Sequence, residues 1–493
     1  MNYISTRNNK LKATAAEAIA NGISKEGGLF VPENIPLLSS ADFDILCTLD
    51  YKERAKFILK YFLTDFSKDE IDYCVEGAYT GSFEHEEPAP IAKLGENINM
   101  LELWHGPTCA FKDLALQLLP YLLTTAAKKV NSGKETVILV ATSGDTGKAA
   151  LEGFSDVENT KIVVFYPSDG VSPMQKLQMD TQKGENVYVC AIKGNFDDAQ
   201  TGVKKIFTDN KIIEKLAAAN KLFSSANSIN WGRLVPQIIY YVSAYCDLKR
   251  ENGITDGFNV VVPTGNFGNI LAAYYAKQMG VPIKKLICAS NANNVLTDFI
   301  NTGVYNRNRD FHTTISPSMD ILISSNLERM LFELSGNDSD KVSEIQDSLA
   351  KNGEFKIEGK MLEDLQGLFY GGCCDDNRTL ETIKKVFEDY GYLSDTHTAV
   401  ALAVYEDYLK TTGDKTPVVI ASTASPYKFA KSVYSAIGGD INGDEFGIVE
   451  AMSADTKTEI PTPIANLKSA KVRFKNIAEK ENMSEVVLNF LGL

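Results

Sequence analysis

The sequence predicts an α/β protein in which parallel β-sheets are covered by helices on both faces. Short apolar runs rich in β-branched residues recur along the chain, for example at 135–141, 161–167 and 258–265, and a helix-like segment follows each run. Strands that are buried on both faces have such continuous apolar runs, and alternation of strands with helices is typical of parallel sheets. Ligands are therefore expected at the carboxyl ends of the strands.

Length and charge narrow the class of protein and of partner. A chain of 493 residues can bury a sizeable core and form two or three domains. The formal net charge of −14 argues against nucleic acid or an anionic membrane as the main partner, so a small-molecule ligand is expected. An anionic ligand would need a local positive site on this acidic protein.

The cysteines and the first residues indicate the compartment. None of the eight cysteines forms a Cys-x-x-Cys pair, so reduced, mostly buried thiols are expected and no metal site is predicted. The first 22 residues contain no apolar signal core, and no segment approaches the length of a membrane span. A cytoplasmic protein without an obligate protein partner is the expectation.

The order of elements begins with a mostly helical region at 1–92. It contains a helix ending at Gly22, a Gly- and Pro-rich turn segment and a helical stretch at 51–80, and an acidic, proline-bearing linker follows at 84–97. Further strands are predicted at 98–104, 135–141, 161–167, 186–192, 258–265, 284–290 and 416–423, and helices from 112, at 146–154, 172–184, 269–280 and 397–410. Residues 300–380 are less regular and are interpreted as an insertion or a loop-rich subdomain.

A glycine-containing loop is the first candidate binding motif. Gly265, Asn266, Phe267, Gly268 and Asn269 connect an apolar strand to a helix. Two glycines allow backbone N–H groups to point at one place, and the helix adds its positive end, which together suit a phosphate. The motif matches neither the P-loop nor the dinucleotide pattern, and a tight turn that merely needs glycine is the alternative.

A second strand–turn–helix segment lies at 139–150. Thr142, Ser143, Asp145 and Thr146 offer polar groups at a helix N-terminus, which suits a carboxylate or a phosphate. The alternative, favoured for this motif alone, is an N-cap in which Ser143 or Asp145 caps a helix that begins at Thr146.

A third candidate contains an arginine. Asn227 and Ser228 precede Arg233, which stands at the start of an apolar helix. A guanidinium can bind an oxyanion with two hydrogen bonds. Taken alone, a helix cap with a surface arginine is the favoured interpretation.

Lys112 stands at the beginning of an apolar helix that Pro120 keeps short or kinks. Burial and the helix dipole would both lower the pKa of this lysine, which makes its amine a nucleophile able to form a Schiff base. The alternative is an ordinary solvated lysine. Three anion-type turns and one such lysine together suit a cofactor with an aldehyde and a phosphate, which is pyridoxal 5'-phosphate.

The order of these motifs resembles a known family. Phe-Lys-Asp (111–113), Ser-Gly-Asp-Thr-Gly (143–147) and Gly-Asn-Phe-Gly-Asn (265–269) follow the order of pyridoxal-phosphate enzymes of the tryptophan-synthase-β type, fold type II. Longer segments are similar to threonine synthases of the long form: "YISTR" (3–7), "GGLFVPENIP" (27–36), "HGPTCAFKD" (105–113), "ATSGDTGKAA" (141–150), "SANSINWGR" (225–233), "PTGNFGN" (263–269), "SPSMDILISSNLER" (316–329) and "DTHTAVA" (395–401). The resemblance covers the chain from residue 3 to about residue 435.

The resemblance implies a fold and a division into domains. The expected fold is that of a fold-type-II enzyme with two three-layer, parallel-sheet α/β domains and a mostly helical N-terminal domain at 1–92. Residues 93–135 and 226–493 would form the large cofactor-binding domain. Residues 136–225 would form a smaller, mobile domain that closes on the substrate.

The resemblance also implies a role for each motif. Lys112 would carry the cofactor, the 265–269 loop would hold its phosphate, and Thr423 would face its pyridine nitrogen. Asp145 would lie near the ring hydroxyl, although many fold-type-II relatives have asparagine there. The substrate carboxylate would bind at Thr142, Ser143 and Thr146, and the substrate phosphate at Asn227, Ser228 and Arg233. His105 and His397 receive no role and are expected to be packed, hydrogen-bonded histidines.

The implied activity is that of a carbon–oxygen lyase of threonine biosynthesis. It converts O-phospho-L-homoserine and water to L-threonine and phosphate by γ-elimination followed by β-addition of water. The sequence leaves open a phospho-lyase that forms 2-oxobutyrate from the same substrate. A serine or threonine dehydratase would not need the phosphate-binding Arg233, and a non-catalytic relative would not need Lys112.

Overall fold

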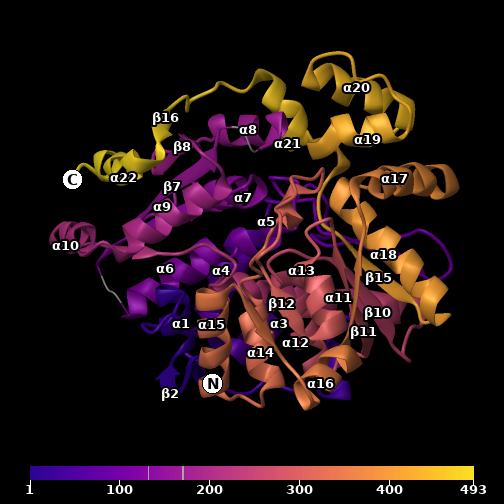
Figure 1. Ribbon diagram of the computed structural model, residues 1–493, viewed down its shortest axis with the longest axis horizontal. Helices are drawn as coiled ribbons and strands as arrows, with labels where there is room; N and C mark the ends of the chain where they lie inside the picture. Colours follow the sequence, from indigo (N-terminus) through magenta and orange to yellow (C-terminus); the bar gives the residue numbers. More distant parts are fainter. Residues whose placement is uncertain (131–132, 169–170) are drawn as a thin grey trace.

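The computed structural model describes residues 1–130, 133–168 and 171–493 and contains two sheets of mainly parallel strands (Figure 1). The larger sheet has the order β14-β11-β10-β15-β5-β4, in which only the edge pair β4–β5 is antiparallel. Its strands are β4 (Ile91–Lys93), β5 (Ile98–Glu102), β10 (Phe258–Pro263), β11 (Ile283–Ser290), β14 (Phe369–Cys373) and β15 (Val418–Ser422). The predicted parallel α/β class is confirmed.

Helices cover both faces of the larger sheet because successive strand residues point to opposite sides. On β10, Val261 belongs to the same apolar cluster as Val400 of α18 (Thr396–Thr412). Its neighbours Val260 and Val262 belong to the cluster on the other face. That second cluster includes α11 (Trp231–Asn252), α12 (Gly268–Gln278) and α13 (Val295–Thr302).

The smaller sheet is entirely parallel and has the order β16-β8-β7-β6-β9. Its strands are β6 (Glu135–Ala141), β7 (Thr160–Pro167), β8 (Val187–Lys193), β9 (Lys221–Ser224) and β16 (Ile477–Glu479), and the helices around it are α7 (Asp145–Phe154), α8 (Pro173–Asp180), α9 (Phe196–Thr208), α10 (Asn210–Ala218) and α22 (Met483–Leu491). The strand predicted at 135–141 and the Ser172 cap of α8 are confirmed.

The C-terminal end of the chain returns to this smaller sheet. β16 pairs with β8, and Met483 and Val487 of α22 join the apolar cluster formed by β6, β7 and α9 (Figure 1). The sheet therefore contains a strand from outside 136–225. The division at 136–225 and the mobility of that region stay predictions.

The N-terminal region combines helices with a small sheet. Its helices are α1 (Ala15–Asn21), α2 (Ser40–Leu46), α3 (Tyr51–Phe62) and α4 (Lys68–Tyr79), and Thr14, Ser39, Asp50 and Ser67 cap them. The sheet, which the sequence interpretation did not include, is antiparallel and consists of β1 (Tyr3–Ser5), β2 (Asn8–Ala13) and β3 (Phe30–Pro32).

Residues 300–380 are not a loop-rich insertion. They contain β12 (Val304–Asn306), β13 (Glu354–Lys356), α14 (Leu327–Leu334), α15 (Ser339–Asn352) and α16 (Lys360–Leu368) and end in β14, an edge strand of the larger sheet. The expectation was wrong because the glycines of β14 (Phe-Tyr-Gly-Gly-Cys) hide its strand pattern, although Gly371 packs against Ile300 of α13.

The remaining elements complete the core and the surface. They are α5 (Lys112–Leu116), α6 (Leu119–Val130), α17 (Asp376–Tyr390), α19 (Ala430–Ala436), α20 (Glu445–Thr456) and α21 (Thr462–Ala465), with 3-10 turns at 317–319, 426–429, 466–469 and 480–482. All eight cysteines are free, and six of them are buried. No helix within the described ranges is long and apolar enough to cross a membrane.

Candidate active site

Lys112 is the first residue of α5, beyond the carboxyl ends of β5 and β15. Phe111 donates a backbone hydrogen bond to the carbonyl of Thr423 (2.8 Å), which fixes the start of α5 against the chain leaving β15. The Lys112 Nζ lies 3.2 Å from Ser318 Oγ and 3.8 Å from Asp145 Oδ2. Burial lowers the pKa of Lys112 to about 8, against the opposing pull of Asp145. The predicted lowering of this pKa is confirmed, and the alternative of a solvated lysine is wrong.

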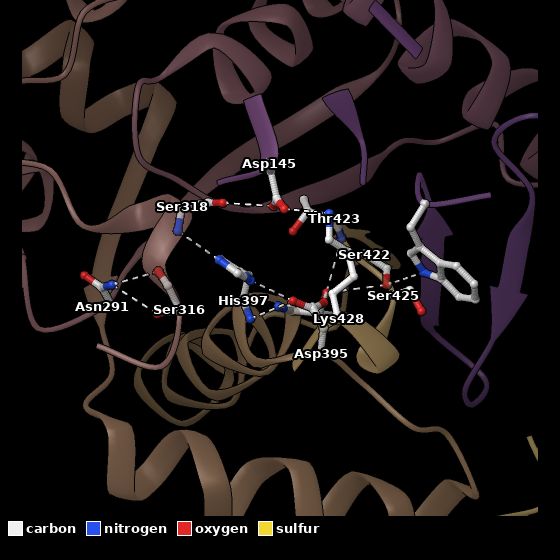
Figure 2. A network of polar contacts seen from close by, with 12 residues as sticks. Asp145, Asn291, Ser316, Ser318, Asp395, His397, Ser422, Thr423, Ser425 and Lys428 are labelled. Carbon is white, nitrogen blue, oxygen red and sulfur yellow. Dashed lines mark hydrogen bonds and ion pairs between the residues drawn. The ribbon is translucent and has the colours of Figure 1, made fainter. Parts of the chain in front are cut away.

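Asp145 is a buried carboxylate shared by several donors. Its Oδ1 lies 2.6 Å from Lys428 Nζ and accepts from Gln175 Nε2 at 2.9 Å. Its Oδ2 accepts from Ser318 Oγ at 3.1 Å and faces Lys112 (Figure 2). Burial alone would raise the pKa of Asp145, but the ammonium groups of Lys428 and Lys112 outweigh burial and hold that pKa well below its usual range. Asp145 is therefore ionised.

The turn before α7 is held by Thr142 and not by a side-chain cap. Thr142 Oγ1 accepts from the backbone N–H groups of Gly144 (3.0 Å) and Gly147 (2.9 Å). The helix begins at Asp145, and its N-cap is Gly144, whose φ of 137° disfavours a side chain. The N-cap interpretation of Ser143 and Asp145 is therefore wrong. Within the described chain, the hydroxyls of the half-buried Ser143 and Thr146 make no hydrogen bond to protein and are available to a ligand.

The glycine loop lies at the carboxyl end of β10. Phe267 has a left-handed conformation (φ 62°) and leads directly into α12. In the part of the chain that the structure describes, the backbone N–H groups of Gly265, Asn266 and Phe267 donate to no protein acceptor. Buried Asn269 accepts from the Tyr241 hydroxyl through Oδ1, whereas its Nδ2 has no partner. These neutral donors have the arrangement of an anion cradle.

Arg233 is buried on the first turn of α11, so its interpretation as a surface residue is wrong. Its Nη1 donates to the carbonyl of Ala226 at 2.6 Å, and its Nε is buried without a partner. No carboxylate among the described residues lies within 4 Å of its guanidinium. Burial lowers its pKa to about 10, so the group stays charged at neutral pH. A buried, unpaired cation calls for an anionic ligand.

The other predicted residues surround the same region. The Ser228 hydroxyl lies 3.4 Å from that of Ser325, which also donates to Asn266 Oδ1 of the glycine loop. The backbone N–H of Asn227 donates to Ser225 Oγ, inside the turn that precedes α11. Buried Thr423 lies at the end of β15, and its hydroxyl makes no hydrogen bond within the described residues.

A polar network not assigned from the sequence includes Ser318, which accepts a hydrogen bond from Lys112 (Figure 2). The backbone N–H of Ser318 donates to His397 Nε2 at 3.1 Å, which leaves a proton on Nδ1 to donate to Asp395 at 2.8 Å. Asp395 also accepts from Thr398, and the hydroxyl of Thr398 lies 3.4 Å from Ser422 Oγ. The expectation of a packed, hydrogen-bonded His397 is confirmed. Ser318, Asp395 and Lys428 were missed because nothing in their local spacing marks them.

Sequence families account for nearly the whole chain. The family described as "Threonine synthase N terminus" matches residues 2–79, and "Threonine synthase, C-terminal" matches residues 398–487. "Pyridoxal-phosphate dependent enzyme" matches residues 84–423, which is more than half of the chain. The threonine synthase of Pseudomonas aeruginosa is 38% identical over 437 residues, which cover 88% of this chain and 90% of that protein.

The chain belongs to the threonine synthase family. A crystal structure of PLP-bound threonine synthase from Brucella melitensis has a TM-score of 0.88, 34% identity and 99% coverage of both chains. The predicted fold-type-II, pyridoxal-phosphate-dependent class is thereby confirmed. The human protein "Threonine synthase-like 1" is 43% identical over 435 residues, which are 86% of this chain and 58% of that protein. This chain therefore spans a little over half the length of that relative.

The site residues of this threonine synthase family member fit pyridoxal phosphate. The aldehyde needs a neutral amine, and Lys112 has the lowered pKa that supplies one. The phosphate needs several donors, and the unpartnered N–H groups of 265–267 with Asn269 Nδ2 supply them. The pyridine nitrogen can be met by the free hydroxyl of Thr423, as the sequence predicts. The assignment of each of these roles stays a prediction.

Proposed function

We propose that this protein converts O-phospho-L-homoserine and water to L-threonine and phosphate. Membership of the threonine synthase family from end to end supports the reaction. The single structural observation that carries the choice of substrate is buried Arg233, which has no carboxylate partner among the residues that the structure describes and is close enough to Lys112 to lower the pKa of that lysine. The Arg233 guanidinium can bind a phosphate, and the nearby Lys112 amine can carry out the proton transfers, so the pair suits a phosphorylated amino acid as substrate.

Different residues bind the two charged ends of the substrate. Arg233, with Asn227 and Ser228, binds the substrate phosphate, because the guanidinium is the only one of these groups that carries a charge to match it. The α-carboxylate binds to Ser143 and Thr146 and to the free amides of the α7 N-terminus, which Thr142 holds in place. The substrate is thereby held at both ends, with its α- and β-carbons between them and next to Lys112.

Lys112 moves the protons. Bound pyridoxal phosphate supplies an electron sink that stabilises negative charge on the substrate α-carbon. The Lys112 amine removes a proton from the α-carbon and, after passing that proton on, removes one from the β-carbon. It returns one proton to the γ-carbon, which becomes the methyl group once phosphate has left, and one to the α-carbon after water has added to the β-carbon, while the remaining proton of that water goes to the released phosphate. A pKa of about 8 suits this alternation, because the amine gains and loses a proton readily near neutral pH. Ser318 Oγ, 3.2 Å from Nζ, holds the amine in place while it does so.

Arg233 assists the departure of phosphate from the γ-carbon. Negative charge grows on the leaving group as the carbon–oxygen bond breaks, and a buried guanidinium stabilises that charge more strongly than an exposed one. A serine or threonine dehydratase has no phosphate to bind, so it would leave Arg233 buried and without an anion. Arg233 therefore favours the phosphorylated substrate.

A product assay tests the proposal. The purified protein is loaded with pyridoxal phosphate and given O-phospho-L-homoserine, and phosphate, threonine and 2-oxobutyrate are quantified together. Phosphate matched by threonine is expected. Phosphate matched by 2-oxobutyrate would replace the proposal with a phospho-lyase. A protein that releases no phosphate from O-phospho-L-homoserine but converts L-serine or L-threonine, given in its place, would be a dehydratase.

A further inference from the structure

Lys428 is an unusual lysine for which the proposed reaction has no use. It lies in the 3-10 turn at 426–429, and its side chain is completely buried. Its Nζ lies 2.6 Å from Asp145 Oδ1 and 2.9 Å from the carbonyl oxygen of Thr108 (Figure 2). An ammonium at full burial is costly unless an opposite charge compensates it. Asp145 is that charge.

The position of Asp145 makes this pair more than a structural ion pair. Asp145 begins α7 beside the smaller sheet, whereas Lys428 and Lys112 both belong to segments that follow or precede strands of the larger sheet. The two carboxylate oxygens divide these contacts. Oδ1 lies near Lys428 and Gln175, and Oδ2 receives Ser318 and lies 3.8 Å from Lys112. Two lysines therefore compete for one carboxylate.

We propose that Lys428 is a positioning residue that neutralises Asp145 and so keeps Asp145 from pairing closely with Lys112. The proposal rests on the role assigned to Lys112 and adds how the pKa of its amine is prevented from rising. The distances show the competition: Lys428 is at hydrogen-bonding distance from the carboxylate, and Lys112 is more than 1 Å farther away. Without Lys428, Lys112 would be the one lysine left beside the Asp145 carboxylate, and the two would form a close ion pair.

The charges around Lys112 give the direction of the effect. Besides Asp145 and Lys428, Lys112 is faced by Arg233 of α11 and by its helix neighbour Asp113, while His397 of α18 contacts the adjacent Ser318. Asp145 and Asp113 stabilise the ammonium form of Lys112, whereas Lys428 and Arg233 destabilise it. Asp113 is occupied by the amide and hydroxyl of Thr108. Loss of the Lys428 charge therefore raises the pKa of Lys112, and loss of the Asp145 charge lowers it.

The ion pair between Lys428 and Asp145 also explains how this chain can have an aspartate where many fold-type-II relatives have asparagine. An asparagine is neutral, and an aspartate with a buried lysine at 2.6 Å is neutral as a unit. The site gains an acceptor for Ser318 and Gln175 without adding a net negative charge beside the substrate carboxylate and the two phosphates. A lone Asp145 would repel all three anions.

The decisive measurement is the pKa of Lys112 in the cofactor-free protein. Competitive acylation at a series of pH values, followed by peptide mass spectrometry, gives the reactivity of the Lys112 amine, with exposed Lys25 as an internal standard. The variants are Lys428→Gln, which removes the charge and keeps an amide donor, Asp145→Asn, and the two together. Lys428→Met serves if the glutamine variant does not fold, as judged by circular dichroism.

The expected result is a cycle with opposite signs. Lys428→Gln shifts the acylation midpoint of Lys112 upward by about one pH unit, and Asp145→Asn shifts it downward. The midpoint of the double variant stays close to that of Asp145→Asn, because Lys428 acts through the Asp145 charge. The rate at which pyridoxal phosphate attaches to the cofactor-free protein at neutral pH follows the same order, because only the neutral amine adds to the aldehyde.

Two outcomes would overturn the proposal. A folded Lys428 variant with an unchanged Lys112 midpoint would show that Lys428 only fills space. A double variant whose midpoint equals the sum of the two single shifts would show that Lys428 acts on Lys112 independently of Asp145. Acylation reports on Lys112 whatever product the enzyme makes, so failure here is distinct from failure of the proposed reaction.

Discussion

The two proposed anion sites, the glycine loop before α12 and the Arg233 site at the start of α11, differ in the chemistry of their donors. The loop offers backbone N–H groups and the Asn269 amide, all neutral. The second site offers a buried guanidinium without a carboxylate partner. A cofactor phosphate stays bound through every turnover, so fixed neutral donors suffice. A substrate phosphate gains charge as it leaves, and a full positive charge stabilises that change.

The largest effect is expected at the charged site. Arg233→Ala removes the guanidinium proposed to bind the substrate phosphate and should cost about 3 kcal/mol of transition-state stabilisation, or roughly 150-fold in kcat/KM. Most of the loss should appear in KM, and the affinity for pyridoxal phosphate should not change. Steady-state kinetics and a cofactor titration by visible absorbance measure the two. Loss of cofactor affinity in this variant would mean that the two sites are not separate.

Cofactor affinity at the glycine loop should depend on the shape of the loop and not on a charge. A Cβ on residue 265 would lie 2.8 Å from the backbone oxygen of Ser318, whereas a Cβ on residue 268 would lie 3.4 Å from the movable Asn326 side chain. Gly265→Ala should therefore weaken cofactor binding by about tenfold, since backbone must shift by a fraction of an ångström in a site where geometry is decisive.

Gly268→Ala is the matched control. It adds the same methyl group to the same loop and should leave cofactor affinity within about twofold of the parent. Equal losses in the two variants would show that the loop tolerates no side chain for reasons other than the contact with Ser318. A change in KM for the substrate without a change in cofactor affinity would assign the loop to the wrong phosphate.

The pH dependence should separate the amine from both anion sites. If Lys112 carries the cofactor as proposed, attachment of pyridoxal phosphate to the cofactor-free protein requires the neutral Lys112 amine, whose pKa is about 8. Below that value the neutral fraction falls, so the attachment rate should fall about tenfold for each pH unit and should level off above pH 8. Stopped-flow absorbance from pH 6 to 9 measures it. A rate that is flat over this range would place the amine pKa lower than the structure indicates.

The comparison also shows why one site could be read from the sequence more fully than the other. The glycine loop is local: five consecutive residues between a strand and a helix carry the donors, so pattern alone located it. Arg233 could be picked out as a candidate, but its burial is a tertiary property of α11, which packs against α3, α5 and α12, and no local pattern records that packing. The sequence therefore favoured a surface arginine.

Long-range partners were the least predictable part of the site. Ser318 contacts Asp145 across 173 residues and His397 across 79 residues, and Lys428 contacts Thr108 across 320 residues. Ser318 and His397 were visible only as parts of segments similar to the family, and Lys428 lies outside those segments. The same limit applies to the fold, where β14 and β16 joined the sheets from regions with no clear strand pattern. The short strand β9 was missed as well, whereas apolar runs, which are local, predicted the other parallel strands.

The smallest effect is expected one contact behind the glycine loop. The Tyr241 hydroxyl donates to Asn269 Oδ1, and this hydrogen bond fixes the orientation of the Asn269 side-chain amide. It thereby also fixes the direction of Nδ2, which has no partner among the described residues. Tyr241→Phe removes the hydroxyl, keeps the ring and leaves the buried amide free to rotate, which costs on the order of 1 kcal/mol. Cofactor affinity should fall about fivefold, and KM for the substrate should not change, because Arg233 is untouched. A titration with pyridoxal phosphate beside substrate kinetics measures both. A rise in KM without weaker cofactor binding would place Asn269 at the substrate phosphate and erase the distinction between a neutral and a charged anion site.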